Sequence, residues 1–193
     1  MPDARQFIEI QGTIALRRGE LAEATIAYET WGQLNTAKDN AVLLFTGLSP
    51  SAHAASSHAD PSSGWWEDMV GPEKPIDTTR YFVVCVNSLG SCFGSTGPAS
   101  IDPATEEPYR LTFPVLCLED VAFAGQQVVE RLGIEHPHTV VGPSIGGMTA
   151  LAHTFMFPAV TKQLVSISSA THSLPFSVAL RSLQREMIRK DPM

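Results

Sequence analysis

The sequence predicts an α/β fold with a mostly parallel central sheet. Short, continuous apolar runs alternate with longer segments of helical periodicity along most of the chain. Such runs are typical of strands that are buried on both faces. They are preceded by two segments in which apolar and polar residues alternate, as they do in antiparallel strands with one face in solvent. We therefore expect an antiparallel N-terminal hairpin followed by a parallel sheet with helices.

The expected elements follow in a regular order. The hairpin strands are predicted at residues 6–10 and 22–31, with a charged turn around residues 17–20. Buried strands are predicted at 41–45, 81–86, 139–141 and 161–167, and a single helical turn at 64–69. Helices are predicted at 119–132, directly after residue 144, and at 175–189. The long loop at 87–109 is of a length that usually serves a function or forms a lid.

The segment from Val140 to Met148 carries Gly-x-Ser-x-Gly between a predicted strand and a predicted helix. In this context the motif predicts a nucleophile elbow, in which Gly142 and Gly146 allow a tight turn and the hydroxyl of Ser144 is exposed. The N–H of Ile145 and the start of the helix could hold an oxyanion. The alternative is a glycine-rich turn with an inert serine. An elbow after the fifth major strand predicts the α/β-hydrolase arrangement.

A second oxyanion donor is expected from the loop after the strand at 41–45. The backbone N–H of Leu48 is the candidate, and its side chain could equally form part of the wall of the site.

Ser144 needs a histidine base held by a carboxylate, and in this fold both follow the serine, acid first. The only later histidines are His153, about two helical turns past the serine, and His172, which no acid precedes in the required order. Residues 175–193 also resemble a helix stopped in mid-course. We therefore expect this sequence to be the N-terminal part of a longer enzyme whose acid and base lie outside it.

Composition limits the possible partners. Hydrophobic residues make up 44% of the 193 residues, which indicates a globular chain, and the net charge of −7 argues against a nucleic-acid surface. The chain has no apolar run long enough for a membrane span, and no signal-peptide pattern. The three cysteines have no metal-type spacing, and Cys85 is expected to be a core thiol. These features favour a cytoplasmic protein without a metal or bound cofactor.

Several long motifs, from about Phe7 to the last residue, resemble the homoserine O-acetyltransferase family. They are Gly64-Trp65-Trp66, Gly71-Pro72-x-x-Pro75-Ile76-Asp77-Thr78, the segment from Tyr81 to Gly90, the segment from Gly94 to Ser100, and the elbow itself. The resemblance implies a cytoplasmic acyltransferase of α/β-hydrolase fold. It implies that an acyl group passes from coenzyme A to an amino-acid hydroxyl through an acyl-serine. Acyl-CoA would then be a substrate, not a cofactor.

The resemblance also implies roles for individual residues. It places the nucleophile at Ser144 and the oxyanion donors at Leu48 and Ile145, with the acid and base beyond Met193. Members commonly dimerise through a helical lid, so residues 1–172 would be the first part of the core domain, residues 173–193 the start of the lid, and the complete protein a homodimer.

The chain departs from the homoserine pattern in ways that are similar to the serine O-succinyltransferase branch, which feeds cysteine synthesis. The loop has Ser49, Pro50, Ser51 and Ala52 in place of the usual residues, and Pro143 replaces a common glycine. Arg181 stands where acetyl-specific members tend to be uncharged, and a guanidinium can hold the carboxylate of a succinyl group. The alternative is an ordinary exposed helix arginine. Residues 49–52 could set the choice between serine and homoserine.

The main hypothesis is transfer of succinyl from succinyl-CoA to L-serine. The runner-up is acetylation or succinylation of L-homoserine, which would feed methionine synthesis, with acetyl-CoA as the other donor. A serine hydrolase and a non-catalytic fragment remain as alternatives.

Overall fold

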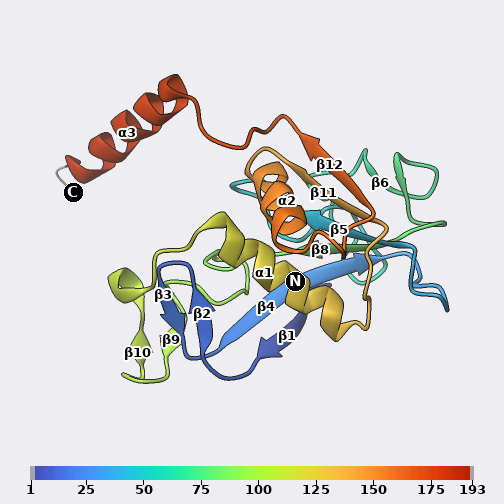
Figure 1. The fold of residues 1–193 in the computed structure, drawn as a ribbon, viewed down its shortest axis with the longest axis horizontal. Coiled ribbons are helices and arrows are strands. Elements are labelled where there is room, and N and C mark those ends of the chain that lie inside the picture. Colours follow the sequence, from blue (N-terminus) through green and yellow to red (C-terminus); the bar gives the residue numbers. More distant parts are fainter. Residues whose placement is uncertain (1–2, 192–193) are drawn as a thin grey trace.

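A computed structural model describes residues 3–191 and confirms the predicted α/β fold (Figure 1). Its centre is a six-stranded sheet of order β1-β4-β8-β5-β11-β12. The strands of this sheet are β1 (Gln6–Ile10), β4 (Ala24–Trp31), β5 (Ala41–Phe45), β8 (Phe82–Val86), β11 (Thr139–Pro143) and β12 (Gln163–Ile167). The helices are α1 (Leu118–Arg131), α2 (Ile145–Met156) and α3 (Pro175–Arg189).

The remaining elements are short. They are β2 (Ile14–Leu16), β3 (Gly19–Leu21), β6 (Val70–Gly71), β7 (Ile76–Asp77), β9 (Ile101–Asp102), β10 (Glu107–Pro108) and the 3-10 helix η1 (Arg110–Thr112). The predicted turn at 64–69 is present as a single turn, in which the N–H of Met69 donates to the carbonyl of Trp66 over 2.8 Å.

Four neighbouring strands run in the same direction. β5 pairs in parallel with β8 and β11, and β11 pairs in parallel with β12. β4 is antiparallel to both of its neighbours, β1 and β8. The carboxyl ends of β5, β8, β11 and β12 therefore meet at one edge of the sheet, which is where ligands bind in open α/β sheets.

The predicted N-terminal hairpin is confirmed by the pairing of β1 with β4, in which Phe7 lies opposite Ala27. Its connection is longer than a turn, because β2 and β3 form a second small hairpin. The N–H of Arg17 at its tip donates to Asp120 of α1 over 2.8 Å. The expectation of one solvated face is wrong for β4, whose residues are buried except for two half-buried threonines. Flanking strands and loops cover it, and even Glu29 is buried.

Two hydrophobic clusters cover the two faces of the sheet. Helices α1 and α2 pack over the first, which includes Leu43, Phe45 and Val140. Their fit is close, since a Cβ on Gly125 of α1 would lie 2.4 Å from the Phe45 ring. On the other face a long loop takes the place of a helix. Its residues Ala52, Ala54, Ala55 and Val70 pack against Trp31, Val42, Leu44 and Val141. The thiol of Cys85 is fully buried here, as expected.

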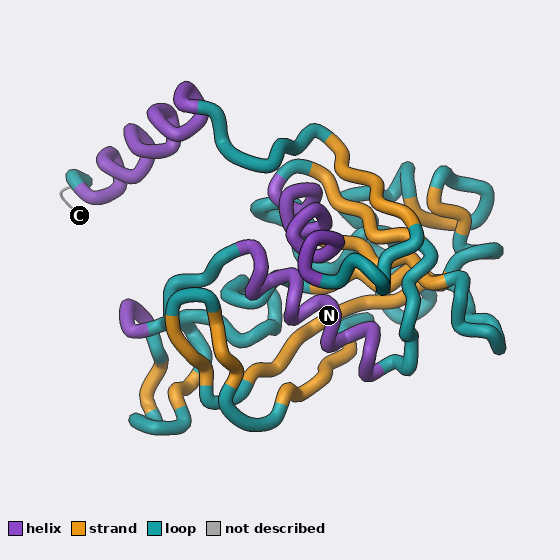
Figure 2. The backbone as a smooth tube through the Cα atoms, viewed as in Figure 1, coloured by secondary structure: helices purple, strands orange, loops and turns teal. Residues whose placement is uncertain are grey.

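The C-terminal part of the chain is exposed. Helix α3 lies apart from the body of the molecule (Figures 1 and 2), and each of its residues is exposed. Its exposed apolar side chains include Phe176, Leu180, Leu183 and Met187. The spacing of these four residues places them on one face of the helix.

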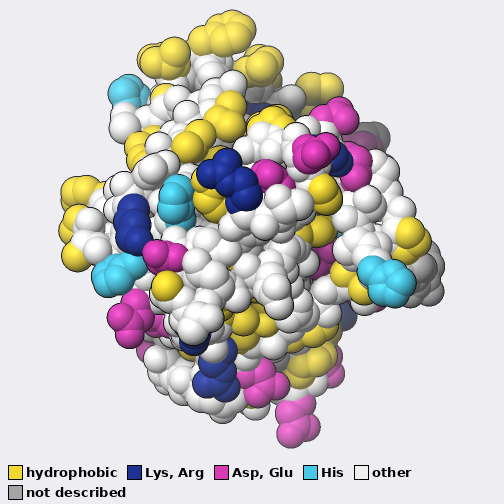
Figure 3. Space-filling model, turned by 90° about the vertical axis from the view of Figure 1, so that its right-hand side faces the viewer, with side chains coloured by type: hydrophobic (Ala, Val, Ile, Leu, Met, Phe, Trp, Pro, Cys, Tyr) yellow, Lys and Arg dark blue, Asp and Glu magenta, His cyan; other side chains and the backbone are white. Residues whose placement is uncertain are grey.

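The surface carries mixed charge. On the face shown in Figure 3, lysine and arginine side chains are interspersed with aspartate and glutamate.

None of the helices among residues 3–191 has both the length and the apolar character needed to cross a membrane.

His153 is fully buried in α2, where the sequence places it away from the reacting face. Its Nε2 lies 2.9 Å from Oε1 of Gln126, and its Nδ1 lies 3.3 Å from the Thr161 hydroxyl. Burial lowers the pKa of His153 to about 4. The ring is therefore neutral, and it joins α2 to α1 as a structural group.

This burial predicts an acid-dependent loss of stability. Below about pH 6.5 the unfolded chain protonates His153, whereas the folded chain keeps it neutral down to about pH 4. The associated stability is present above pH 6.5 and is lost as the pH falls toward 4, by up to about 3 kcal/mol. Urea unfolding at pH 7.5, 6 and 5 should show a smaller acid loss for His153→Gln than for the parent. In the exposed control His172→Gln, the free energy of unfolding should fall with pH as steeply as in the parent. An equally steep fall in His153→Gln and His172→Gln would contradict the assignment.

Candidate active site

Ser144 occupies a strained, exposed turn between β11 and α2. Its backbone angles are φ 56° and ψ −124°, outside the regions that a serine ordinarily adopts. Such a conformation costs roughly 1–3 kcal/mol and persists only where the surroundings enforce it. The N–H of Ser144 donates to the carbonyl of Ile167 at the end of β12, over 2.8 Å, and its own carbonyl accepts from Gly147 and Met148. This is the strand–turn–helix geometry that the Gly-x-Ser-x-Gly motif predicts, and the nucleophilic role of Ser144 stays a prediction.

Three glycines permit the turn, because backbone atoms occupy the space of their missing side chains. A Cβ on Gly142 would lie 2.3 Å from the carbonyl carbon of Gly146. A Cβ on Gly146 would lie 2.4 Å from the carbonyl oxygen of Phe45, and one on Gly147 would lie 2.7 Å from that of Gly142. Any larger residue would push the helix away from β5 and β11. The packing of α2 against β5 and β11 therefore requires these glycines, whatever the chemistry of Ser144.

The two expected oxyanion donors meet at one hollow. Ile145 begins α2 directly after Ser144, and Leu48 follows β5 at the same edge of the sheet. Both line a hollow of about 480 Å³, here called the oxyanion hollow; its other lining residues include Ser91, Leu116, Val121 and Thr149. Leu48 is 68% exposed, and the expected donor is its backbone N–H rather than its side chain.

Buried polar groups anchor the loop that carries Leu48. The carboxamide of Asn87, at the end of β8, accepts from the N–H of Ala52 over 2.6 Å and donates to the carbonyl of Phe93 over 2.9 Å. One side chain thus joins the loops that follow β5 and β8. Asn87 lies within a family motif but was assigned no role from the sequence, although a polar residue directly after a buried strand was a usable signal.

A histidine–glutamate pair anchors the same loop farther along. Nδ1 of His53 lies 2.9 Å from Oε2 of the buried Glu29 in β4, and Nε2 lies 2.9 Å from the carbonyl of Ser62. While Glu29 is ionised both partners are acceptors, and a doubly protonated ring then satisfies them. Burial alone would lower the pKa of His53, but these hydrogen bonds raise it above its ordinary value. Burial raises the pKa of Glu29, and the bond to His53 opposes that rise.

The four candidate specificity residues of the loop lie at different depths. Ser49 is exposed, and Pro50 and Ser51 are half-buried. The carbonyl of Ser51 accepts from the indole N–H of Trp65 over 2.9 Å. Ala52 is fully buried in the core, so an influence of its side chain on a substrate would act through the position of the loop.

Arg181 is not brought to Ser144. It lies on the exposed helix α3, and its guanidinium donates to Oε1 of Gln184 one turn farther along, over 3.0 Å. The structure also supplies no general base: no histidine between residues 3 and 191 hydrogen-bonds the Ser144 hydroxyl. His153 is buried elsewhere, and His172 is exposed, with the Thr171 hydroxyl 3.3 Å from its Nδ1.

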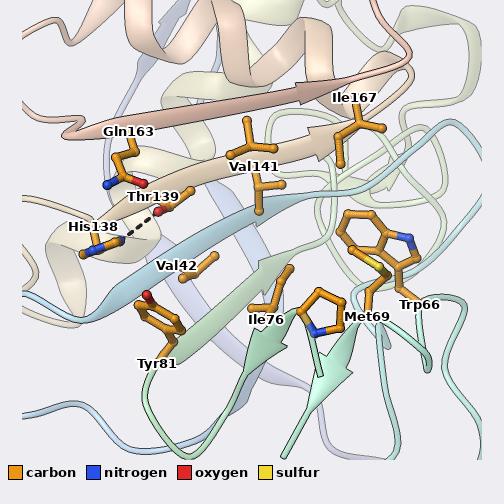
Figure 4. A pocket seen from close by; sticks show the side chains of 12 residues that line it. Val42, Trp66, Met69, Ile76, Tyr81, His138, Thr139, Val141, Gln163 and Ile167 are labelled. Carbon is orange, nitrogen blue, oxygen red and sulfur yellow. Dashed lines mark hydrogen bonds between the residues drawn. The ribbon is translucent and has the colours of Figure 1, made fainter. Parts of the chain in front are cut away.

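A second hollow lies on the opposite face of the sheet (Figure 4). It has a volume of about 280 Å³, and side chains of Val42, Val141, Ile167, Ile76, Met69 and Trp66 line it. At one end Nδ1 of His138 lies 2.8 Å from the Thr139 hydroxyl. Most of the lining is apolar, and neither candidate oxyanion donor is part of it. Both candidate donors line the oxyanion hollow instead, which is therefore the candidate for the reacting site.

Comparison with known proteins agrees with this geometry. The model of the alpha/beta hydrolase fold family matches residues 40–189, which include the elbow and the loop of Leu48. The chain belongs to this family. A crystal structure of homoserine O-acetyltransferase from Bacillus anthracis superimposes with a TM-score of 0.88 at 31% identity, covering 98% of this chain and 54% of that one.

Several relatives match the whole chain. A protein named serine O-succinyltransferase from Litchfieldella anticariensis is 63% identical over 193 residues, which are 53% of its own length. A protein named L-serine/homoserine O-acetyltransferase from Streptomyces lavendulae is 59% identical, over 52% of its length. These matches confirm the resemblance that the sequence motifs indicated. The chain spans about half the length of the curated relatives it matches.

The anchoring role of Asn87 can be tested by truncation. Asn87→Ala leaves the Ala52 N–H and the Phe93 carbonyl without their partner, which should cost about 1–3 kcal/mol of stability. Because the loop of Leu48 is then less well fixed, acylation of Ser144 by an activated ester should slow by roughly 10-fold or more. The measurement is burst kinetics on protein from the complete reading frame. The exposed Asn35→Ala should behave as the parent, and an unchanged burst rate in a folded Asn87→Ala protein would refute the role.

Proposed function

We propose that the chain is the nucleophile-bearing part of an acyl-CoA-dependent O-acyltransferase that transfers succinyl from succinyl-CoA to the hydroxyl of L-serine. The observation that carries this proposal is the match of all 193 residues, at 63% identity, with a relative named serine O-succinyltransferase. The exposed Ser144 and the two candidate oxyanion donors support it, because acyl transfer requires a nucleophile and a site for developing negative charge.

The proposed chemistry has two steps. The Ser144 hydroxyl attacks the thioester carbon; the C–O bond forms, the C–S bond breaks, and the serine proton passes through a base to the departing coenzyme A thiolate. The hydroxyl of L-serine then attacks the acyl-Ser144 ester, its proton passes to Ser144, and O-succinyl-L-serine leaves. In both steps the N–H groups of Leu48 and Ile145 stabilise the oxyanion. Following the family resemblance, the proposal assigns the base to a histidine outside this chain.

The proposal extends to assembly and pathway. The exposed apolar stripe of α3, which includes Phe176, Leu180, Leu183 and Met187, needs an apolar partner and supports a homodimer. The product would be an activated serine suited to cysteine synthesis in the cytoplasm.

A second candidate function is acetylation of L-serine or L-homoserine. The 59% identical relative named L-serine/homoserine O-acetyltransferase favours it. Ser49 and Pro50 are the accessible candidates for the choice of acceptor. One methylene is worth only about 1–3 kcal/mol in such a pocket.

The decisive assay follows coenzyme A release by protein expressed from the complete reading frame. Succinyl-CoA and acetyl-CoA are each paired with L-serine and L-homoserine. The proposal expects succinyl-CoA with L-serine to give the highest kcat/KM. Ser144→Ala should lower it at least about a thousandfold, because the covalent route is lost. Preference for acetyl-CoA or L-homoserine would favour the second candidate, and release of free succinate without an amino acid would indicate a hydrolase.

Arg181 is expected to select the donor. If its guanidinium holds the succinyl carboxylate, Arg181→Ala should lower kcat/KM for succinyl-CoA by roughly 10- to 100-fold, the value of a charged hydrogen bond. Use of acetyl-CoA should change little. Arg185→Ala, on the same helix, is the matched control. Equal losses with both donors would refute the assignment.

A further inference from the structure

The oxyanion hollow contains a hydroxyl that the fold does not use. The Oγ of Ser91 is buried and has no hydrogen-bond partner within the described part of the chain. The backbone is satisfied, since the N–H of Ser91 donates to the carbonyl of Ser88 over 3.1 Å. Neighbouring hydroxyls have partners: Ser88 Oγ lies 3.3 Å from Thr46 Oγ1, and Thr149 donates to the carbonyl of Ile145. A buried, unpaired polar atom in a residue that lines the same hollow as Leu48 and Ile145 requires an explanation, and a ligand contact supplies one.

The walls around this hydroxyl are uncharged. Among the described residues, the lining of the hollow includes Leu48, Leu89, Leu116, Val121 and Thr149, and no acidic or basic side chain. A free amino acid would bring an ammonium group to walls that offer no anion, whereas one carboxylate could accept a hydrogen bond from the Ser91 hydroxyl. Intact coenzyme A, with its charged phosphates, is too large for about 480 Å³. An acyl chain of two to four carbons fits both the volume and the apolar walls.

We propose that the oxyanion hollow is the acyl-binding subsite, and that the Ser91 hydroxyl hydrogen-bonds a distal oxygen of the acyl group. This inference rests on the proposed acyl transfer at Ser144 and names where the transferred group lies. When the Ser144 ester forms, its carbonyl oxygen faces the donors at Leu48 and Ile145, and the carbon chain extends between Val121 and Ser91. For a succinyl group the distal oxygen belongs to the terminal carboxylate, so Ser91 is a specificity residue independent of Arg181.

The test measures acylation of Ser144 and needs no amino acid. Acetyl, butyryl and succinyl thioesters of N-acetylcysteamine are mixed with protein from the complete reading frame, and the burst of thiol release is followed. Val121→Phe should narrow the hollow from α1 and slow butyryl and succinyl acylation at least tenfold more than acetyl acylation. Ser91→Ala removes the hydroxyl and should slow succinyl acylation about tenfold relative to butyryl acylation.

The neighbouring Cys92 is exposed and does not line the hollow, so Cys92→Ala should leave all three rates in their parent ratios. Thermal unfolding establishes that each variant is folded. If Val121→Phe does not fold, the comparison of succinyl with butyryl acylation in Ser91→Ala alone tests the subsite. Unchanged ratios in both hollow variants, or an equal loss with all three thioesters, would overturn the subsite. If the acylation rate depends on the length of the acyl chain as expected but no acyl group is transferred to an amino acid, the proposed function is refuted and the acyl-binding subsite is supported.

Discussion

Close approach of three backbone segments at the elbow is the constraint on which the site depends. The start of α2 touches the end of β5 through Gly146, and β11 touches α2 through Gly142. The conformation of Ser144 is unfavourable alone, and the hydrogen bond to Ile167 helps to enforce it. A hydroxyl that is fixed and exposed, at the start of a helix, loses little freedom when it reacts. The strain and the packing around it therefore supply preorganisation.

Buried polar groups extend this rigidity to the loop that completes the site. Asn87 and the Glu29–His53 pair hold positions only a few residues beyond Leu48, whereas the side chain of Leu48 itself is exposed. Fixed anchors beside an accessible backbone are what an oxyanion site requires, because the donor must be both immobile and reachable. His153, although equally polar, is buried among aromatic rings and serves the packing of α2 instead.

Local pattern was enough to predict the elbow and most of the sheet. The spacing of Gly142, Ser144 and Gly146 predicts a turn whose geometry depends on only a few neighbouring residues. Helix α3 also begins and ends at the predicted residues. The burial of β4, the β2–β3 hairpin and the two bonds of Asn87 depend on partners distant in sequence. Periodicity carries no information about such partners. For the same reason the sequence did not indicate the free hydroxyl of Ser91, since an unpaired atom is visible only once its surroundings are known.

The bond from Ser144 to Ile167 also orders events during synthesis. Ser144 is translated before β12, yet the acceptor of its N–H lies at the end of that strand, and Ser169, just beyond it, lies against Gly147. Because chains grow from the N-terminus, residues 163–169 must leave the ribosome and pair with β11 before this hydrogen bond can form. A shorter nascent chain lacks the acceptor that helps to hold Ser144 in its strained turn.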